Sequence, residues 1–204
     1  MRDGLLALLF GWIAAVHPVT AAPVTAPATQ VHRTFPVPGH VSYGHAHHDY
    51  PATDIWAACG RRVLSPVDGV VLQVERVDRW GPATDRGRDR SGRFVSIKGA
   101  DGVRYYGSHL AAVQRGMRAG LRVRAGQQVG SVGRSGNARY VGCQLHFGLS
   151  PVCRGTGEWW IRRGTVEPYP YLRSWQRGGN RSPASAVADW RRRHGCPARA
   201  SVDP

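Results

Sequence analysis

Short apolar segments separated by glycine-containing turns fill most of this sequence between residues 62 and 133. In residues 70–77 (VVLQVERV) apolar and polar residues alternate, and a period of two predicts strands rather than helices. The 26 glycines and 14 prolines of the chain favour many turns and short elements. A chain of 204 residues is long enough for one domain with a substantial core, whereas two full domains would be cramped. The sequence therefore predicts an all-β domain.

Two hairpins are predicted from turn chemistry. The Asp68-Gly69 pair lies between the apolar segment 63–67 and the alternating segment 70–77, and Asp-Gly between two apolar runs is a strong hairpin signal. Residues 94–98 and 103–107 also alternate and are joined by the sequence Gly-Ala-Asp-Gly. We expect a second tight hairpin there.

The sequence after Pro151 has a different character. Ser182 is a suitable N-cap, Pro183 fits the first turn and Gly195 is a stop signal, so one C-terminal helix is predicted between them. Before this helix lies an aromatic run, which we expect to cover a sheet edge and which could alternatively stack on sugar rings: Trp159, Trp160, Tyr169, Tyr171 and Trp175.

Residues 80–93 interrupt the strand pattern with interleaved arginines, aspartates and glycines. Such a composition favours an exposed, solvated insertion. The alternative is that this loop walls a substrate groove.

The charge of the chain is strongly skewed, with 28 Lys+Arg against 13 Asp+Glu and a formal net charge of +15. Such a surface favours polyanions, of which nucleic acid, anionic lipid and phosphate-bearing bacterial wall polymers are the candidates. Lys98 is the single lysine, so nearly all of the positive charge comes from arginine. A compositional bias toward arginine explains the lack of lysine as well as selection for anion binding does. Because no recognition helix or base-stacking motif is apparent, specific nucleic-acid binding is not expected.

The N-terminus has the layout of a secretory signal. A charged start is followed by an apolar stretch from Leu5 to Val16 and by small residues near Ala21, so we expect a signal peptide over residues 1–21 and export of the mature chain. The apolar stretch is too short to span a bilayer as a helix. Residues 22–37, rich in Pro, Thr, Ala and Val, are predicted to form an extended linker or a first edge segment.

Four cysteines in an exported chain predict two disulfides, for which three pairings exist. We favour Cys143 with Cys153, because a bridge there would brace the segment between them, which leaves Cys59 with Cys196. Cys143 and Cys153 could instead be zinc ligands, but this is disfavoured because their spacing is not that of a structural zinc knuckle.

The segment 45–55 (HAHHDYPATDI) concentrates three histidines and two carboxylates before an apolar, strand-like stretch. Imidazole and carboxylate are ligands that zinc accepts readily, and a catalytic zinc commonly keeps three protein ligands. This segment could supply two of them, and His146 is the best candidate for the third. Read as a strand, Gln144 and His146 share one face while Leu145 and Phe147 face a core.

His109 directly follows the strand predicted at 103–107. At the end of a strand it could reach a site built on neighbouring strands. The alternative is a partly buried histidine that is hydrogen-bonded to backbone.

In this order, the motifs resemble the lysostaphin-type (LytM-like) zinc metallopeptidases, a family of peptidoglycan endopeptidases. The resemblance covers roughly residues 40–150 and rests on five segments: His48 with Asp54-Ile55, VLSPVDGV at 63–70, YGSHL at 106–110, VRAGQQVGSVGRSGN at 123–137 and QLHF at 144–147. It implies a single antiparallel β-sheet domain of this type over residues 38–178, followed by the C-terminal helix and tail at 179–204. As a set these motifs are specific, although each alone is weak.

The resemblance further implies one zinc ion held by His48, Asp54 and His146, with His109 acting beside the metal. Two departures from the family pattern bear on activity. The family histidine stands four residues before the aspartate, where this chain has Tyr50, so a longer loop must deliver His48 and His47 is the alternative ligand. Gln144 replaces the first histidine of the family's His-Leu-His motif, and glutamine can polarise a carbonyl but cannot carry a proton.

The sequence thus predicts a secreted, wall-associated zinc endopeptidase that acts on peptidoglycan as a monomer, with His109 and Gln144 as catalytic residues. The main alternative is a degenerate domain that binds the wall or regulates another hydrolase. A lipoyl-like or phosphotransferase-like carrier is disfavoured, because Lys98 is not set at a hairpin tip with the flanks such a module needs.

Overall fold

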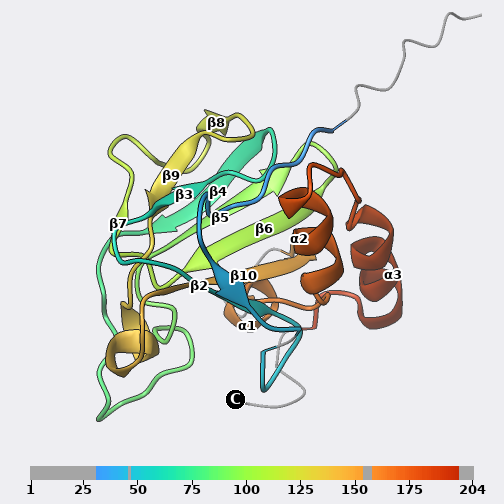
Figure 1. The fold of residues 1–204 in the computed structure, drawn as a ribbon. Helices are drawn as coiled ribbons and strands as arrows, with labels where there is room; N and C mark the ends of the chain where they lie inside the picture. Colours follow the sequence, from blue (N-terminus) through green and yellow to red (C-terminus); the bar gives the residue numbers. More distant parts are fainter. Residues whose placement is uncertain (1–30, 46, 154–157, 198–204) are drawn as a thin grey trace, which may run out of the picture. The chain divides into compact units, whose positions relative to one another are not determined.

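The computed structural model describes residues 31–45, 47–153 and 158–197 (Figure 1). The signal peptide predicted at 1–21 lies outside the described residues. Within them the chain forms ten strands in two antiparallel sheets, three α-helices and one 3-10 helix, η1 (Gly136–Tyr140). The predicted all-β class is confirmed, with two sheets in place of the single sheet expected.

The larger sheet contains the strands that matter for the site. Its order is β1-β2-β10-β6-β5-β4-β8, with bounds β1 (Ser42–Tyr43), β2 (Thr53–Trp56), β10 (Gln144–Pro151), β6 (Val103–Ser108), β5 (Phe94–Gly99), β4 (Gly69–Glu75) and β8 (Arg122–Val123). The smaller sheet has the order β3-β9-β7, with bounds β3 (Arg62–Leu64), β9 (Gln128–Ser131) and β7 (Ala112–Val113).

Side-chain alternation divides the larger sheet into a core face and a second face. On β10, Leu145 and Phe147 enter the hydrophobic core together with Ile97 of β5 and Tyr105 of β6. The core face packs against apolar residues of the smaller sheet such as Val63. The residues that alternate with these core residues along each strand therefore have their side chains on the second face, as a period of two requires.

Two helices follow the sheet where the aromatic run was predicted. Trp159 and Trp160 open α1 (Trp159–Arg162), and the Arg162 guanidinium lies 4.3 Å from the Phe94 ring centroid on the second face. Trp175 belongs to α2 (Tyr169–Gln176) and contacts Phe147 on the core face, with ring centroids 6.2 Å apart. Tyr169 of α2 lies against Tyr43 of the edge strand β1, with ring centroids 5.8 Å apart, so the run covers both faces of the sheet and, at Tyr169, the sheet edge that was predicted.

The predicted C-terminal helix is confirmed as α3 (Ala184–His194), which ends at Gly195. Gly195 has a φ of 66°, a left-handed conformation that glycine adopts without steric cost. The N-cap is Pro183, one residue after the predicted Ser182, although the Ser182 Oγ accepts a hydrogen bond from the backbone N–H of Ala184 at 3.3 Å. None of the helices within the described residues has the length and apolar character needed to cross a bilayer.

The predicted hairpin at 94–107 is confirmed, since β5 and β6 pair antiparallel. The predicted hairpin at Asp68-Gly69 is wrong. β3 pairs with β9 in the smaller sheet, whereas β4 pairs with β5 and β8 in the larger one. The Asp68 carboxylate instead accepts a hydrogen bond from the Ala125 N–H at 2.7 Å, so this segment is a crossing between the sheets.

The favoured disulfide pairing is also wrong. The bridges are Cys59–Cys143 and Cys153–Cys196. Cys143 and Cys153 flank β10, and an extended strand separates residues ten apart by about 30 Å, far beyond the reach of a disulfide. The observed bridges instead join the loop after β2 to the start of β10, and the end of β10 to the residues after α3.

The part of the predicted linker that lies within the described residues, 31–37, is packed against the domain. Val37 is fully buried, and the Thr34 N–H donates to the Pro66 carbonyl at 2.8 Å. Arg33 is buried as well, and its guanidinium pairs with Asp101 at 2.6 Å. This stretch is therefore an edge segment of the fold.

Candidate metal centre

Three neighbouring strands place polar residues in one row across the second face of the larger sheet. The register pairs His146 of β10 with Asp54 of β2 on one side and with Ser108 of β6 on the other. Directly paired residues of antiparallel strands have side chains on the same face, about 5 Å apart. The strand pairing alone thus brings together residues that are far apart in sequence.

His146 is held through both ring nitrogens. Its Nδ1 lies 2.9 Å from Asp54 Oδ1, and its Nε2 lies 3.0 Å from the backbone carbonyl oxygen of Arg163. A carbonyl oxygen only accepts, so Nε2 carries a proton and donates it. The ring is therefore oriented with Nδ1 toward the carboxylate. Burial on its own raises the pKa of Asp54, but the hydrogen bond and charge of His146 outweigh it and the pKa is lowered overall.

His47 completes a cluster with these two residues. Ligand atoms of His47, Asp54 and His146 all lie within 4.8 Å of one another, and His47 Nε2 is 4.0 Å from Asp54 Oδ2. The backbone N–H of His47 donates to the Ala52 carbonyl at 2.8 Å, which folds the loop back toward β2. Burial, reinforced by the charge of His146, lowers the pKa of His47 to about 4, so the ring is neutral at pH 7.

The structure does not bring His48, the ligand expected from the sequence, into this cluster. The His48 side chain is 77% exposed, and its Nδ1 lies 2.6 Å from the Asp49 carboxylate. The His48 ring stacks on the His47 ring, with centroids 4.2 Å apart, and keeps most of its surface in solvent. His47 is the histidine of this loop that faces Asp54.

His109 lies on the other side of His146, with the two ring centroids 5.8 Å apart. Its Nδ1 lies 2.8 Å from the Ser135 carbonyl oxygen, so Nδ1 is the protonated nitrogen and the lone pair of a neutral ring is on Nε2. Burial, with a smaller contribution from His146, lowers the pKa of His109 to about 4. This position agrees with the prediction that His109 reaches a site on neighbouring strands, and equally with the alternative of a buried histidine that is hydrogen-bonded to backbone.

Gln144, the other expected catalytic residue, is buried on β10, and its side-chain oxygen has no hydrogen-bond partner among the described residues. It does not belong to the described residues that line the cavity beside the histidines. Its place on the same strand face as His146 agrees with the alternation predicted from the sequence.

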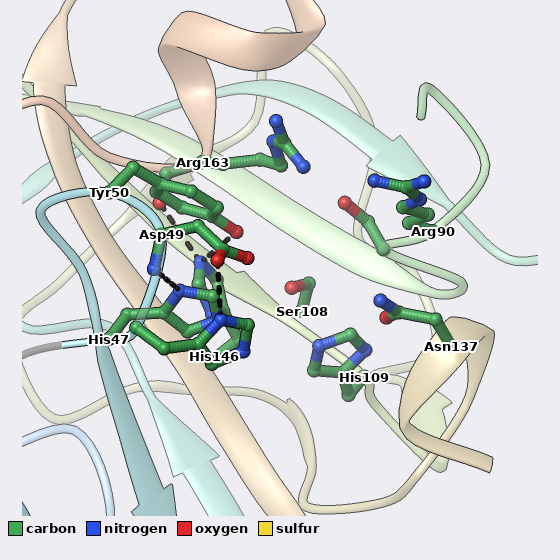
Figure 2. Close-up of a pocket in the computed structure, with 11 residues that line it drawn as sticks. His47, Asp49, Tyr50, Arg90, Ser108, His109, Asn137, His146 and Arg163 are labelled. Carbon is green, nitrogen blue, oxygen red and sulfur yellow. Dashed lines mark hydrogen bonds and ion pairs between the residues drawn. The ribbon is translucent and has the colours of Figure 1, made fainter. Parts of the chain in front are cut away.

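A cavity of about 60 Å³ opens beside the cluster (Figure 2). It is lined by His47, His48, Asp49, Tyr50, Arg90, Ser91, Ser108, His109, Asn137, His146 and Arg163. Arg90 and Ser91 come from the loop at 80–93, so the expectation of a solvated insertion is wrong for this part of the loop. A Cβ on Gly136 would lie 2.0 Å from the Arg90 carbonyl oxygen, which shows how closely the loop packs against η1.

The model of peptidase family M23 matches residues 48–156, just over half of the chain. The chain belongs to peptidase family M23. The matched range includes Asp54, His109, Gln144 and His146.

Among curated proteins, this M23 domain is similar to the L-Ala–D-Glu endopeptidase of Bacillus subtilis (strain 168). The two are 32% identical over 133 residues, which cover 63% of this chain and 36% of that protein. The chain thus spans about a third of the length of this relative.

Among solved structures, the M23 domain is similar to a putative glycyl-glycine endopeptidase lytM from Ruminococcus gnavus, with a TM-score of 0.55 and 23% identity over 74% of this chain and 63% of that one. It is also similar to lysostaphin from Staphylococcus simulans, with a TM-score of 0.50 and 21% identity over 68% of this chain and 50% of that one. These likenesses establish the lysostaphin/LytM type of fold.

The donor set of the M23 domain fits a divalent zinc ion. Two imidazoles and one carboxylate converge, and metal-binding histidines usually donate their second ring N–H to a carbonyl or carboxylate, as His146 does to the Arg163 carbonyl.

Sequence reasoning missed several residues of the site, among them Tyr50 and Arg163. The Tyr50 hydroxyl lies 3.5 Å from His146 Nε2, and burial raises the pKa of this phenol. Tyr50 stands where the family histidine was expected, which is the one local signal that marks it. Arg163 lies outside every motif, and no sequence signal identifies it.

Proposed function

We propose that this M23 domain is a zinc-dependent endopeptidase that hydrolyses peptide bonds in bacterial peptidoglycan. The observation that carries the proposal is the convergence of His47, Asp54 and His146 beside a cavity that a neutral His109 also lines. Family membership supports the same conclusion.

In this proposal His47, Asp54 and His146 hold one zinc ion. When bound, zinc would polarise the scissile carbonyl and lower the pKa of water toward neutrality. His48 is left outside the ligand set because its ring is exposed and faces Asp49.

His109 is proposed as the group that moves the proton. Its Nδ1–H is engaged by the Ser135 carbonyl, so its Nε2 is the nitrogen that can take a proton and return it to the leaving amine. The Tyr50 hydroxyl and the Asn137 side chain line the same cavity and offer hydrogen-bond donors for the peptide carbonyl.

The similarity to an L-Ala–D-Glu endopeptidase supports a bond within the stem peptide as the substrate. We further propose export, monomeric action and retention on anionic wall polymers. Two disulfides are consistent with an oxidising compartment, and a net charge of +15 favours an anionic surface.

A second candidate function is that of a degenerate domain that binds the wall or regulates another hydrolase. Gln144 favours it, because glutamine cannot share a proton transfer with His109. This alternative predicts that the domain binds zinc and wall material but releases no new peptide termini from peptidoglycan.

The test is digestion of purified peptidoglycan by the zinc-loaded protein, with fragments identified by mass spectrometry. We expect new peptide termini with the native protein and none with Asp54→Ala. Zinc binding without any new termini would replace the endopeptidase proposal with the degenerate-domain alternative.

Zinc content tests the ligand set separately. We expect His47→Ala to lose bound zinc and His48→Ala to retain it, measured by elemental analysis after dialysis. The reverse result would restore the ligand predicted from the sequence.

A further inference from the structure

Arg163 is a buried cation without a carboxylate partner. It lies directly after α1 and is 6% exposed, and its Nε has no hydrogen-bond partner among the described residues. No carboxylate of the described residues lies within ion-pair distance of its guanidinium. Burying an unpaired charge is costly, so such a group needs an explanation.

Two of the other three buried arginines of the described chain have a carboxylate partner. Arg33 pairs with Asp101 at 2.6 Å, and Arg104 pairs with Glu158 at 2.8 Å. Arg162, the neighbour of Arg163, donates to the Gln73 side-chain oxygen at 3.2 Å. Among the described residues Arg162 and Arg163 are therefore the buried arginines without a carboxylate partner, and of the four it is Arg163 that lines the cavity.

Aromatic rings hold the Arg163 guanidinium in place. Its central carbon lies 4.6 Å from the Tyr50 ring centroid and 4.7 Å from the Trp159 ring centroid. Stacking occupies the flat faces of a guanidinium and leaves the N–H groups at its edge free to donate. That planar edge matches a carboxylate, which can accept two parallel hydrogen bonds.

The surroundings of Arg163 strengthen the preference for an anion. Figure 2 shows its side chain extending from the Tyr50 side of the cavity toward the side where Arg90 lies. Arg90 is bound to Asp85 at 2.8 Å and still contributes positive charge to this wall. Burial lowers the pKa of Arg163, and the positive charges of Arg90 and Arg162 act in the same direction, so an incoming anion would relieve both effects.

The backbone of Arg163 is tied to the cluster. Its carbonyl accepts the His146 Nε2–H at 3.0 Å, so the residue that offers the guanidinium also orients a proposed zinc ligand. A group bound at the Arg163 side chain is thereby held beside the reacting bond.

We propose that Arg163 binds a free carboxylate that the substrate peptide carries next to the scissile bond. The inference rests on the proposed function and narrows its substrate class to peptides with an acidic residue at the cleavage site. An alanyl–D-glutamate bond has this chemistry, because glutamate has two carboxyl groups and needs only one to continue the chain. A glycine-only bridge lacks the carboxylate and is predicted to be a poor substrate.

The test compares two stem peptides that contain the alanyl–D-glutamyl bond and differ only in whether the spare carboxyl is free or amidated. We expect the native protein to favour the free carboxylate by roughly ten- to a hundredfold in kcat/KM, the usual effect of hydrogen bonds to a charged group. Arg163→Gln should abolish this ratio, and Arg163→Lys should retain part of it. Arg115→Gln, which removes an exposed arginine that does not line the cavity, should leave the ratio unchanged.

The ratio of the two kcat/KM values is measured with both peptides on the same protein preparation. It therefore does not depend on the fraction of a variant that is folded. Equal rates on the two peptides, or a preference that survives Arg163→Gln, would overturn the inference while leaving the endopeptidase proposal intact.

Binding of the same peptides to the zinc-free protein, followed by calorimetry, separates the two proposals further. Suppose that the protein binds the free-carboxylate peptide more tightly, that this preference requires Arg163, and that the zinc-loaded protein cleaves neither peptide. This result would support the carboxylate site and reject the endopeptidase proposal. Equal binding of both peptides by the zinc-free native protein would count against the carboxylate site.

Discussion

His109 occupies a backbone conformation that few residues other than glycine adopt. Its φ is 62°, and its N–H donates to the Ser91 carbonyl at 3.1 Å while its ring donates to the Ser135 carbonyl. A strained residue persists only where its surroundings over-determine it, and such residues cluster at functional sites. Contacts from two loops fix the direction of this ring toward His146.

Replacement of His109 by glutamine tests its role. Glutamine keeps hydrogen-bonding capacity but cannot carry a proton, so we expect kcat to fall by about a hundred- to ten-thousandfold with zinc content unchanged. Peptide hydrolysis and elemental analysis on the same sample measure both. His40→Gln, at an exposed position, serves as the matched control. Activity within a few-fold of the native protein after His109→Gln would show that His109 is structural.

At the scale of elements, the segment after α1 reaches the site because two glycines let it approach. A Cβ on Gly148 of β10 would lie 2.0 Å from the Arg163 carbonyl oxygen, and a Cβ on Gly164 would lie 2.1 Å from the Pro51 carbonyl oxygen. Gly164 also has a φ of 147°. The close approach at Gly148 is what allows the Arg163 carbonyl to bond His146.

The substitution Gly148→Ala is expected to displace the segment that carries Arg163. Overpacking of this kind costs about 1–3 kcal/mol of the free energy of unfolding, and His146 would lose the acceptor of its Nε2–H. We therefore expect lower stability in urea together with weaker zinc affinity. Gly81→Ala, where a Cβ meets open space, should change neither. Native zinc affinity in Gly148→Ala would show that the Arg163 carbonyl does not matter for the ligand.

At the scale of the whole domain, Arg33 connects three distant parts of the chain. It pairs with Asp101 in the turn between β5 and β6, at 2.6 Å, and donates to Ser182 Oγ just before α3, at 2.9 Å. Both side chains of the ion pair are nearly buried, at 4% and 6% exposure. The N-terminal edge segment, the larger sheet and the C-terminal helix therefore share one polar junction.

Breaking this junction is expected to destabilise the fold. Asp101→Asn leaves the buried Arg33 cation without its counter-charge, which costs about 3–5 kcal/mol of the free energy of unfolding. Combination with Arg33→Met, which removes that cation, should recover part of the loss. Asp189→Asn removes an exposed pair with Arg192 and should cost under about 1 kcal/mol. Denaturant unfolding of the native protein and these three variants provides the comparison, and equal losses for Asp101→Asn and Asp189→Asn would contradict the account.

Local pattern was sufficient for much of the fold. Alternation in 94–98 and 103–107 predicted a real hairpin, and the stop signal at Gly195 predicted the end of α3. The same alternation placed Gln144 and His146 on the face opposite Leu145, which is how the structure has them. These predictions succeed because side-chain direction along a strand, and the ends of a helix, depend on neighbouring residues.

The sequence by itself thus determined the β-rich class and the strand that presents His146, and it singled out Asp54 and His109 as candidate site residues. Only the tertiary structure decided that His47 faces the cluster in place of His48, that Cys143 bonds Cys59, and that Arg163 enters the cavity. Each of these depends on which distant segments lie side by side. Strand register and loop packing set those distances through contacts between residues far apart in the chain, and a local pattern carries no record of them.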